Sequence, residues 1–216
     1  MLPQNLEPTE VRVLGSLIEK ELSTPDHYPL SLNALTGACN QSSNREPVMT
    51  LDESSVSHAI DVLRRLGLVR SFQASGSRVP KYQHLLAEAV DLSRAERAVL
   101  CVLALRGPQT LAEVRSRAAR LMPGDDADSV EAALEALTAR EPDAAVTRLP
   151  RRPGQKEARY AHRLGGEVVF EREDTPAATP IAATDRISAL EEIARELKNE
   201  ISDLRSQLAE FRKQFE

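Results

Sequence analysis

The sequence predicts a mainly α-helical protein with small β-hairpin wings: two tandem winged-helix domains followed by a C-terminal coiled-coil helix. Three observations lead to this class. Aromatic residues make up 3% of the 216 residues and tryptophan is absent, so the core must consist of aliphatic side chains, a composition that favours helices. One apolar pattern occurs twice along the chain. The C-terminal end carries a heptad pattern.

Residues 6–22 and 92–107 are predicted to form the first helix of each copy, because they share apolar positions at helical spacing and at a constant offset of 86 residues. A second shared frame, Ser-Val-x-x-Ala-apolar-x-x-Leu, occupies 55–63 and 129–137 at an offset of 74. An internal duplication, with the second copy shorter by 12 residues between its helices, explains both offsets. The positions matched at the first offset are Leu6, Glu10, Val13, Leu14 and Leu17, and Leu92, Glu96, Val99, Leu100 and Leu103.

Each copy also contains a short second helix and a hairpin. Residues 31–40 and 110–122 are predicted helices, with Ser31 and Thr110 as N-caps. In the first copy Gly67 ends the third helix, and strands follow near 68–74 and 81–86; in the second copy the strands lie near 144–150 and 158–164. Three helices and a hairpin form a winged helix. We therefore expect winged-helix domains at 1–88 and 89–165; the alternative, one mixed helical domain, does not predict the repeated frames.

Beyond these domains the pattern predicts a linker and a helix. Residues 166–184 contain Pro176, Pro180 and many small residues, as linkers do. Residues 185–216 place apolar side chains at alternating spacings of three and four, and Glu200 would face Arg205 of a parallel partner helix. The helix either forms a homodimer or packs on its own domains. The predicted dimerisation residues are Ile187, Leu190, Leu197, Ile201, Leu204, Leu208 and Phe211.

Charge and cysteine usage restrict the class of protein. The formal net charge is −5, but residues 1–86 hold 8 basic and 9 acidic side chains and residues 87–165 hold 13 and 12, so the acidity lies in the tail and local patches must decide the partners. Cys39 and Cys101 lie in helical apolar patterns and are expected to be buried thiols. No signal-peptide pattern and no membrane-spanning apolar run occurs, so we expect a cytoplasmic protein without a membrane partner.

The polar stretch 36–56 interrupts the helical pattern between the second and third helices of the first copy. Side chains of this kind bind base edges and phosphates. They also cap helices and form turns, and the apolar Pro47, Val48 and Met49 suggest that the loop folds back on its own domain. Both interpretations stay open. The candidate contacts in this stretch are Asn40, Gln41, Asn44 and Arg45.

The third helix and the hairpin supply further candidates. In the first copy Ser55, Ser57 and His58 face outward from the third helix, and Arg78 and Lys81 lie in the wing. The third helix of the second copy carries Asp125, Asp126, Asp128, Glu131 and Glu135, which nearly exclude it as a reader of DNA. Its wing is basic, and could face nucleic acid, an acidic protein or only solvent. The candidates in that wing are Arg148, Arg151, Arg152, Lys156 and Arg159.

The stretch from Leu6 to Arg70, with Asn-Gln-Ser-Ser-Asn-Arg-Glu-Pro-Val at 40–48 and the hairpin strand ending at Leu86, closely resembles the YceH-like family of bacterial proteins of unknown function. The resemblance covers the first domain almost completely and the second in layout. It implies a tandem winged-helix fold with a helical tail, and it implies that 40–48 is the identifying feature of the family. It brings no activity and no catalytic residue.

We do not expect an enzyme. His27, His58, His84 and His162 are scattered, neither cysteine has a neighbour at metal-ligand spacing, and there is no glycine-rich phosphate loop, so no metal or other cofactor is expected. The first hypothesis is a transcription-regulator-like protein that binds double-stranded DNA and dimerises through its tail. The second is a protein–protein interaction module whose winged helices dock a partner and whose coiled coil binds that partner or a second copy.

Overall fold

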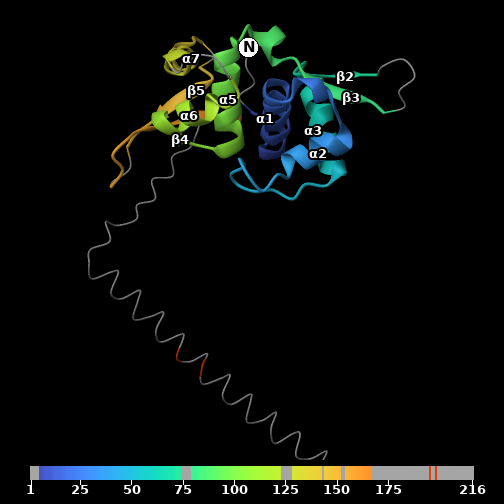
Figure 1. Cartoon of the computed structure of the whole chain (residues 1–216), viewed down its shortest axis with the longest axis horizontal. Helices are drawn as coiled ribbons and strands as arrows, with labels where there is room; N and C mark the ends of the chain where they lie inside the picture. The colour runs from blue at the N-terminus through green and yellow to red at the C-terminus, as the bar shows by residue number, and fades with distance from the viewer. Residues whose placement is uncertain are drawn as a thin grey trace, which may run out of the picture. The chain divides into compact units, whose positions relative to one another are not determined.

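The computed structural model describes residues 5–73, 79–122, 128–142, 144–151 and 154–166, together with Arg195 and Lys198. The described residues up to Gly166 belong to one compact unit (Figure 1). The predicted heptad positions, and the linker except Gly166, lie outside the described residues. No described helix has the length and apolar character that a membrane span requires.

The first half of the compact unit contains helices α1 (Pro8–Ser23), η1 (Pro25–His27), α2 (Leu32–Cys39) and α3 (Glu53–Arg65) and strands β1 (Leu30–Ser31), β2 (Val69–Phe72) and β3 (Lys81–His84). The short helix α4 (Leu86–Val90) leads into the second half. That half contains α5 (Arg94–Arg106), β4 (Gln109–Thr110), α6 (Leu111–Ala118), α7 (Asp128–Ala139), β5 (Val146–Leu149) and β6 (Arg159–His162). Apart from η1, both halves run helix, strand, helix, helix, strand, strand.

The structure is a mixed α/β fold with two small antiparallel sheets, ordered β1-β3-β2 and β4-β6-β5. The two sheets pair their strands in the same way: Leu30 of β1 lies opposite Tyr82 of β3, and Gln109 of β4 lies opposite Tyr160 of β6. Both predicted hairpins are present, as β2–β3 and β5–β6. Strands β1 and β4 were not predicted, because two residues are too few to show a strand periodicity.

The predicted N-caps and the Gly67 helix end are confirmed, whereas α6 ends at Ala118 and not at residue 122. The Ser31 hydroxyl accepts a hydrogen bond from the backbone N–H of Ala34, and the Thr110 hydroxyl accepts one from Glu113. Gly67 has φ of 71°, and the next backbone N–H, of Leu68, donates to the Leu63 carbonyl at 2.9 Å. This is a Schellman end, which requires a left-handed residue that glycine supplies without strain. It turns the chain from α3 directly into β2.

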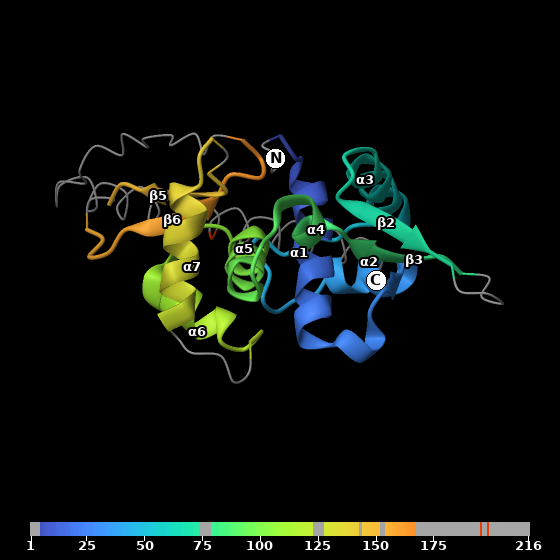
Figure 2. The ribbon, with the colours of Figure 1, turned by 90° about the horizontal axis from the view of Figure 1, so that it is seen from above.

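Helices α1 and α5 lie side by side at the centre of the unit (Figure 2). Each is buried around most of its circumference, as a central helix must be. The Sγ of Cys101 lies 3.5 Å from the carbonyl oxygen of Gly15, and these residues are separated by the repeat offset of 86. Contact between equivalent positions is what a two-fold arrangement of two copies produces. The two halves therefore share one core, and both cysteines are buried free thiols, as predicted.

Gly15 allows α1 and α5 to approach closely. A Cβ at this position would lie 3.0 Å from Cδ2 of Leu105 and 3.3 Å from Cβ of Ala104. We expect Gly15→Leu to lower the free energy of unfolding by about 1–3 kcal/mol, because the added side chain overpacks the contact between the halves. Urea denaturation measures this loss.

The matched control is Gly37→Leu on the exposed face of α2, where an added Cβ meets no atom within 4 Å. We expect this variant to be as stable as the wild type or slightly more stable, because leucine favours a helix more than glycine does. Equal losses in the two variants would mean that the close contact between α1 and α5 is unimportant for stability.

Candidate nucleic-acid interface

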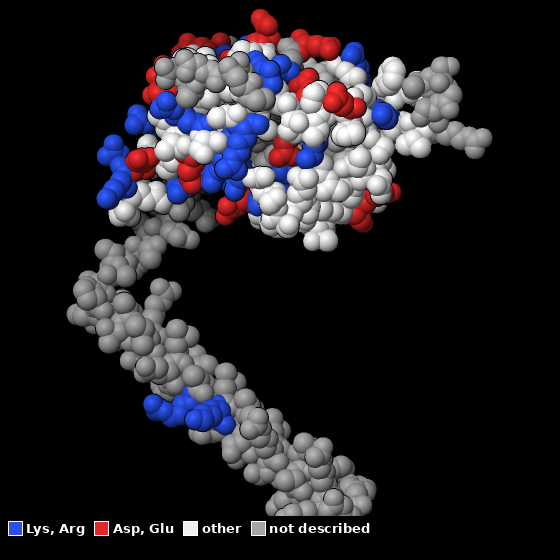
Figure 3. Space-filling view, viewed as in Figure 1, with Lys and Arg blue, Asp and Glu red and all other residues white. Residues whose placement is uncertain are grey.

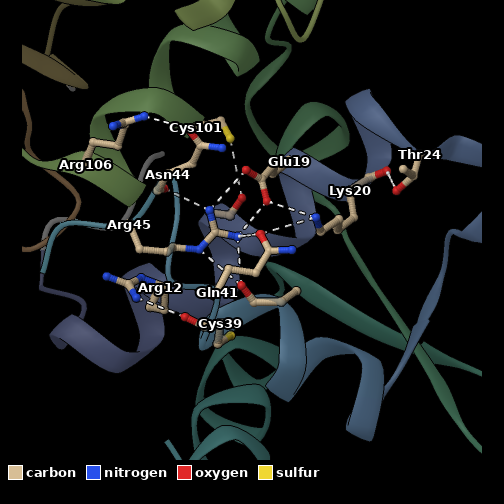
Figure 4. A network of polar contacts seen from close by, with 12 residues as sticks. Arg12, Glu19, Lys20, Thr24, Cys39, Gln41, Asn44, Arg45, Cys101 and Arg106 are labelled. Atoms are coloured by element: carbon tan, nitrogen blue, oxygen red, sulfur yellow. Dashed lines mark hydrogen bonds and ion pairs between the residues drawn. The ribbon is translucent and has the colours of Figure 1, made fainter. Parts of the chain in front are cut away.

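The loop from Asn40 to Asp52, here the 40–52 loop, is organised by the side chain of Arg45 (Figure 4). Its Nη2 lies 2.6 Å from Oε2 of Glu19 on α1, and its Nη1 lies 3.1 Å from Oε1 of the same carboxylate. Its Nε donates to the carbonyl of Ala38 at 3.1 Å. The side chain is completely buried, with 0% exposed. Arg45 therefore joins α1, the end of α2 and the loop in one ion pair with two parallel hydrogen bonds.

Other polar side chains close the loop around this pair. Asn40 donates to the Leu51 carbonyl at 2.7 Å and accepts from the Leu51 N–H at 2.8 Å, so one amide bridges both ends of the loop. The Oε1 of Gln41 accepts from Arg45 at 3.0 Å. The buried guanidinium of Arg12 donates to the carbonyls of Cys39 and Pro47. Burial, and then the charge of Arg45, lower the pKa of Arg12.

The loop also contacts the second half of the protein. The backbone N–H of Glu46 donates to the Leu105 carbonyl at 2.8 Å. Asn44 has φ of 59°, and its Oδ1 accepts from Nη1 of Arg106 at 2.7 Å. Asparagine tolerates this left-handed conformation better than most residues. The polar stretch that interrupts the helical pattern is therefore a connection between α1 and α5.

The prediction that Arg45 contacts nucleic acid is wrong, because its guanidinium is enclosed and bonded to Glu19 and Ala38. Asn40 is partly exposed and its amide bonds Leu51 at both ends, so for this residue contact stays a prediction. Gln41 is partly exposed and Asn44 is exposed, although the side-chain oxygen of each accepts a hydrogen bond from an arginine, so for them contact stays a prediction. The sequence showed the hydrogen-bonding groups of this loop without showing their partners.

The outer face of α3 keeps the predicted polar residues accessible. Ser55 and His58 are exposed and Ser57 is partly exposed, while Val56 and Ile60 are buried beneath them. Asp52 caps the helix by accepting a hydrogen bond from the Ser55 N–H at 2.7 Å. Hydrogen bonds from Ser55, the side-chain one first, lower the pKa of Asp52. This carboxylate has a structural role at the start of the helix.

An open groove of about 500 Å³ lies between the end of α3 and β2. Three arginines line it: Arg64 and Arg65 from the last turn of α3, and Arg70 from β2. Asp61 also lines it and pairs with Arg64 at 3.3 Å, with both side chains about half exposed. Arg70 was not among the predicted residues, although the buried Val69 beside it implies that it points outward. We call this surface the α3 groove.

Lys81 is exposed at the start of β3, while the other predicted residue of this wing, Arg78, lies outside the described residues. Arg64 and Arg65 also suit their helix position, because basic side chains in the last turn stabilise the helix dipole. The α3 groove thus offers cations beside the polar face of α3. The predicted wing cation Lys81 is on the neighbouring strand of the same sheet.

The wing of the second half also forms a groove, of about 290 Å³, against α6. Arg115, Arg148 and Arg151 line its sides, and Tyr160 contributes an aromatic ring. Lys156 is exposed, and Arg152 lies outside the described residues. Figure 3 shows Lys and Arg side chains gathered over this half of the molecule, with Asp and Glu among them.

Part of this positive charge is paired. Arg159 lies 3.6 Å from Glu113, and Arg115 lies 3.9 Å from Glu131 of α7. The two hairpins extend toward opposite ends of the compact unit (Figures 1 and 2). The two basic grooves therefore belong to different hairpins and share no lining residue.

Comparison with known proteins identifies the family. Residues 6–155 match the model of a family described as "Protein of unknown function, DUF480". The chain belongs to this family. Its relatives include a UPF0502 protein of Pelobacter propionicus, 51% identical over 98% of both chains, and a UPF0502 protein of Geobacter sulfurreducens, 49% identical over 98% of both. A UPF0502 protein of Vibrio atlanticus is 45% identical over 96% of this chain and 95% of its own.

These matches confirm the resemblance to a bacterial family of unknown function that the sequence around 40–48 indicated. The family model includes both halves up to residue 155, and the relatives match over almost the whole chain. The family description names no activity, so any function must be argued from the grooves and the loop themselves.

Proposed function

We propose that each half is a winged-helix module and that the first half binds double-stranded DNA. The element order helix, strand, helix, helix, strand, strand, with a three-stranded antiparallel sheet, supports the winged-helix assignment. The observation that carries the DNA proposal is the α3 groove, which places three arginines beside the exposed polar face of α3. A helix that binds in the major groove of DNA needs this combination, since contacts to phosphates supply affinity and polar side chains bond to base edges.

In this proposal α3 enters the major groove and presents Ser55, Ser57 and His58 to base edges. Arg64, Arg65 and Arg70 contact phosphates, and Lys81 extends these contacts along the wing. The basic wing of the second half adds a further phosphate contact through Arg148, Arg151 and Lys156. A coiled coil of residues 185–216 would pair two such chains on a two-fold symmetric site.

The test is fluorescence anisotropy of a labelled mixed-sequence duplex, titrated with the full chain at several salt concentrations. We expect the logarithm of the affinity to fall linearly with the logarithm of salt. The double variant Arg64→Ala/Arg70→Ala should bind about tenfold more weakly at low salt, with a slope smaller by roughly two, because two phosphate contacts are lost.

The matched control is Arg94→Ala, which removes an exposed arginine at the start of α5 and outside the α3 groove. It should bind DNA as the wild type does. The proposal is wrong if wild-type protein shows no binding at low salt, or if the control and the double variant weaken binding equally. In the second case binding reflects general positive charge and not the α3 groove.

A second candidate function is protein docking, and the first hairpin carries the observation that favours it. Phe72 on β2 is 51% exposed and Val79 next to β3 is 55% exposed. Exposed apolar side chains on one hairpin are typical of a surface that binds a protein. Under this alternative, Phe72→Ser would abolish association with a partner and leave the anisotropy of a DNA titration unchanged.

A further inference from the structure

A small pocket lies where the two halves meet. We call it the junction pocket; its volume is about 70 Å³. Its lining comes from α1, the 40–52 loop, α5, α6 and the turn after α6. We propose that the junction pocket binds a phosphate group through Arg106, Arg117 and Arg120. This site is separate from the α3 groove, and no residue lines both.

The three arginines create a concentration of positive charge in a confined space. Arg106 is the last residue of α5. Arg117 lies in the last turn of α6 and Arg120 lies just after that helix, so α5 and α6 bring the three arginines together. Burial, followed by the charge of Arg117, lowers the pKa of Arg106, and Arg120 acts in the same direction. The three guanidinium groups therefore repel one another and would be stabilised by an anion between them.

One of these guanidinium groups has an unused donor. The Nη1 atom of Arg117 is buried and has no hydrogen-bond partner within the described part of the chain. Buried N–H groups nearly always have an acceptor, because leaving one without a partner costs about 1–3 kcal/mol. Because Arg117 also lines the pocket, we infer that a bound oxyanion is the acceptor for this donor.

Two acidic groups near the pocket, Glu19 and Glu113, already form ion pairs, and the charge of Glu46 partly opposes the lowering of the pKa of Arg106. Glu19 also lines the pocket, but its carboxylate is held by Arg45 at 2.6 Å and lies 3.4 Å from Lys20. Glu113 pairs with Arg117 at 3.5 Å and with Arg159 at 3.6 Å. Among the residues that line the junction pocket, three are arginines and one is a glutamate, so the lining carries an excess of positive charge.

The shape and chemistry of the pocket favour a tetrahedral oxyanion. Arginine donors are arranged in a planar fork that matches phosphate oxygens. A pocket of about 70 Å³ holds a group only a few times the size of a water molecule. It is smaller than the open α3 groove, so a single phosphate group fits it better than a stretch of nucleic-acid backbone does.

The experiment measures thermal unfolding and isothermal titration calorimetry of the full chain with inorganic phosphate, against chloride at the same ionic strength. We expect a saturable rise in Tm of about 2–4 °C for the wild type, because a ligand that binds only the folded state stabilises it. Arg117→Gln and Arg120→Gln should each weaken phosphate binding at least tenfold. Because Arg120 is exposed, its variant keeps the test valid even if Arg117→Gln does not fold.

The matched control is Arg115→Gln, on the same helix but lining the other groove, and it should bind phosphate as the wild type does. No saturable binding to the wild type, or equal weakening in all three variants, would overturn the proposal. A parallel titration with glycerol 1-phosphate separates two sources of the group. Tighter binding of the ester assigns the pocket to a phosphorylated metabolite, and tighter binding of inorganic phosphate assigns it to the free ion.

Discussion

Replacing Arg45 by methionine is expected to lower the free energy of unfolding by about 3–5 kcal/mol, because it leaves the carboxylate of Glu19 without its buried partner. The variant also removes the donors that bond the carbonyls of Ala38 and Asn44. Arg45→Lys should lose a large part of the same stability, since an ammonium cannot form the two parallel bonds to Glu19. Urea denaturation of each variant gives these differences.

The matched control is Arg64→Met, which breaks an exposed ion pair with Asp61 and should change stability by less than about 1 kcal/mol. The double variant Arg45→Met/Glu19→Met should recover part of the loss, because it leaves no unpaired buried charge. If Arg45→Met were as stable as the control, the buried pair would not hold the 40–52 loop, and Arg45 would again be a candidate for external contacts.

Acid is expected to destabilise the protein through His162. Burial lowers its pKa in the folded protein to about 4, from an ordinary value of 6.5, and its Nδ1 is buried without a partner in the described part of the chain. Above the ordinary value both folded and unfolded states are neutral, so pH has no effect through this group. Between that value and about 4 the unfolded state binds a proton that the folded state excludes, and stability falls as pH falls.

From these pKa values, the loss reaches about 2 kcal/mol by about pH 5. His162→Gln removes the titrating ring, so the difference in stability between wild type and variant should shrink by this amount between about pH 7.5 and about pH 5. His58→Gln is the control, because His58 is exposed on α3. Denaturant titrations at both pH values measure these free energies of unfolding. If wild type and His162→Gln lost equal stability between the two pH values, His162 would not titrate across this range.

The regular elements of the compact unit could be predicted because their causes are local. The Ser31 and Thr110 caps, the Gly67 turn and the apolar spacing of α1 and α5 all act within a few residues, so the sequence displays them directly. Strands β1 and β4 depend on pairing with a hairpin many residues later. That pairing leaves no pattern in two residues.

The candidate site was harder to predict because its decisive contacts are distant in sequence. Arg45 lies 26 residues from Glu19 in the sequence, and the residues of the loop do not indicate that its partner is a carboxylate on α1. An arginine between asparagine and glutamate is equally suited to bind a phosphate or an internal acid, and only the packing of α1 decides. Arg70 shows the opposite case, since a charged residue next to apolar Val69 in a predicted strand indicates the outer face of the sheet.

The contact between Gly15 and Cys101 has a consequence for how this protein behaves on dilution. If the two halves were separate chains joined through such a face, they would dissociate as their concentration falls, because their association depends on mass action. Here a covalent connection fixes the effective concentration of each half for the other, whatever the amount of protein. The two halves of one chain also need not have the same sequence. The third helix of the second half, α7, is acidic, while the third helix of the first half, α3, is polar.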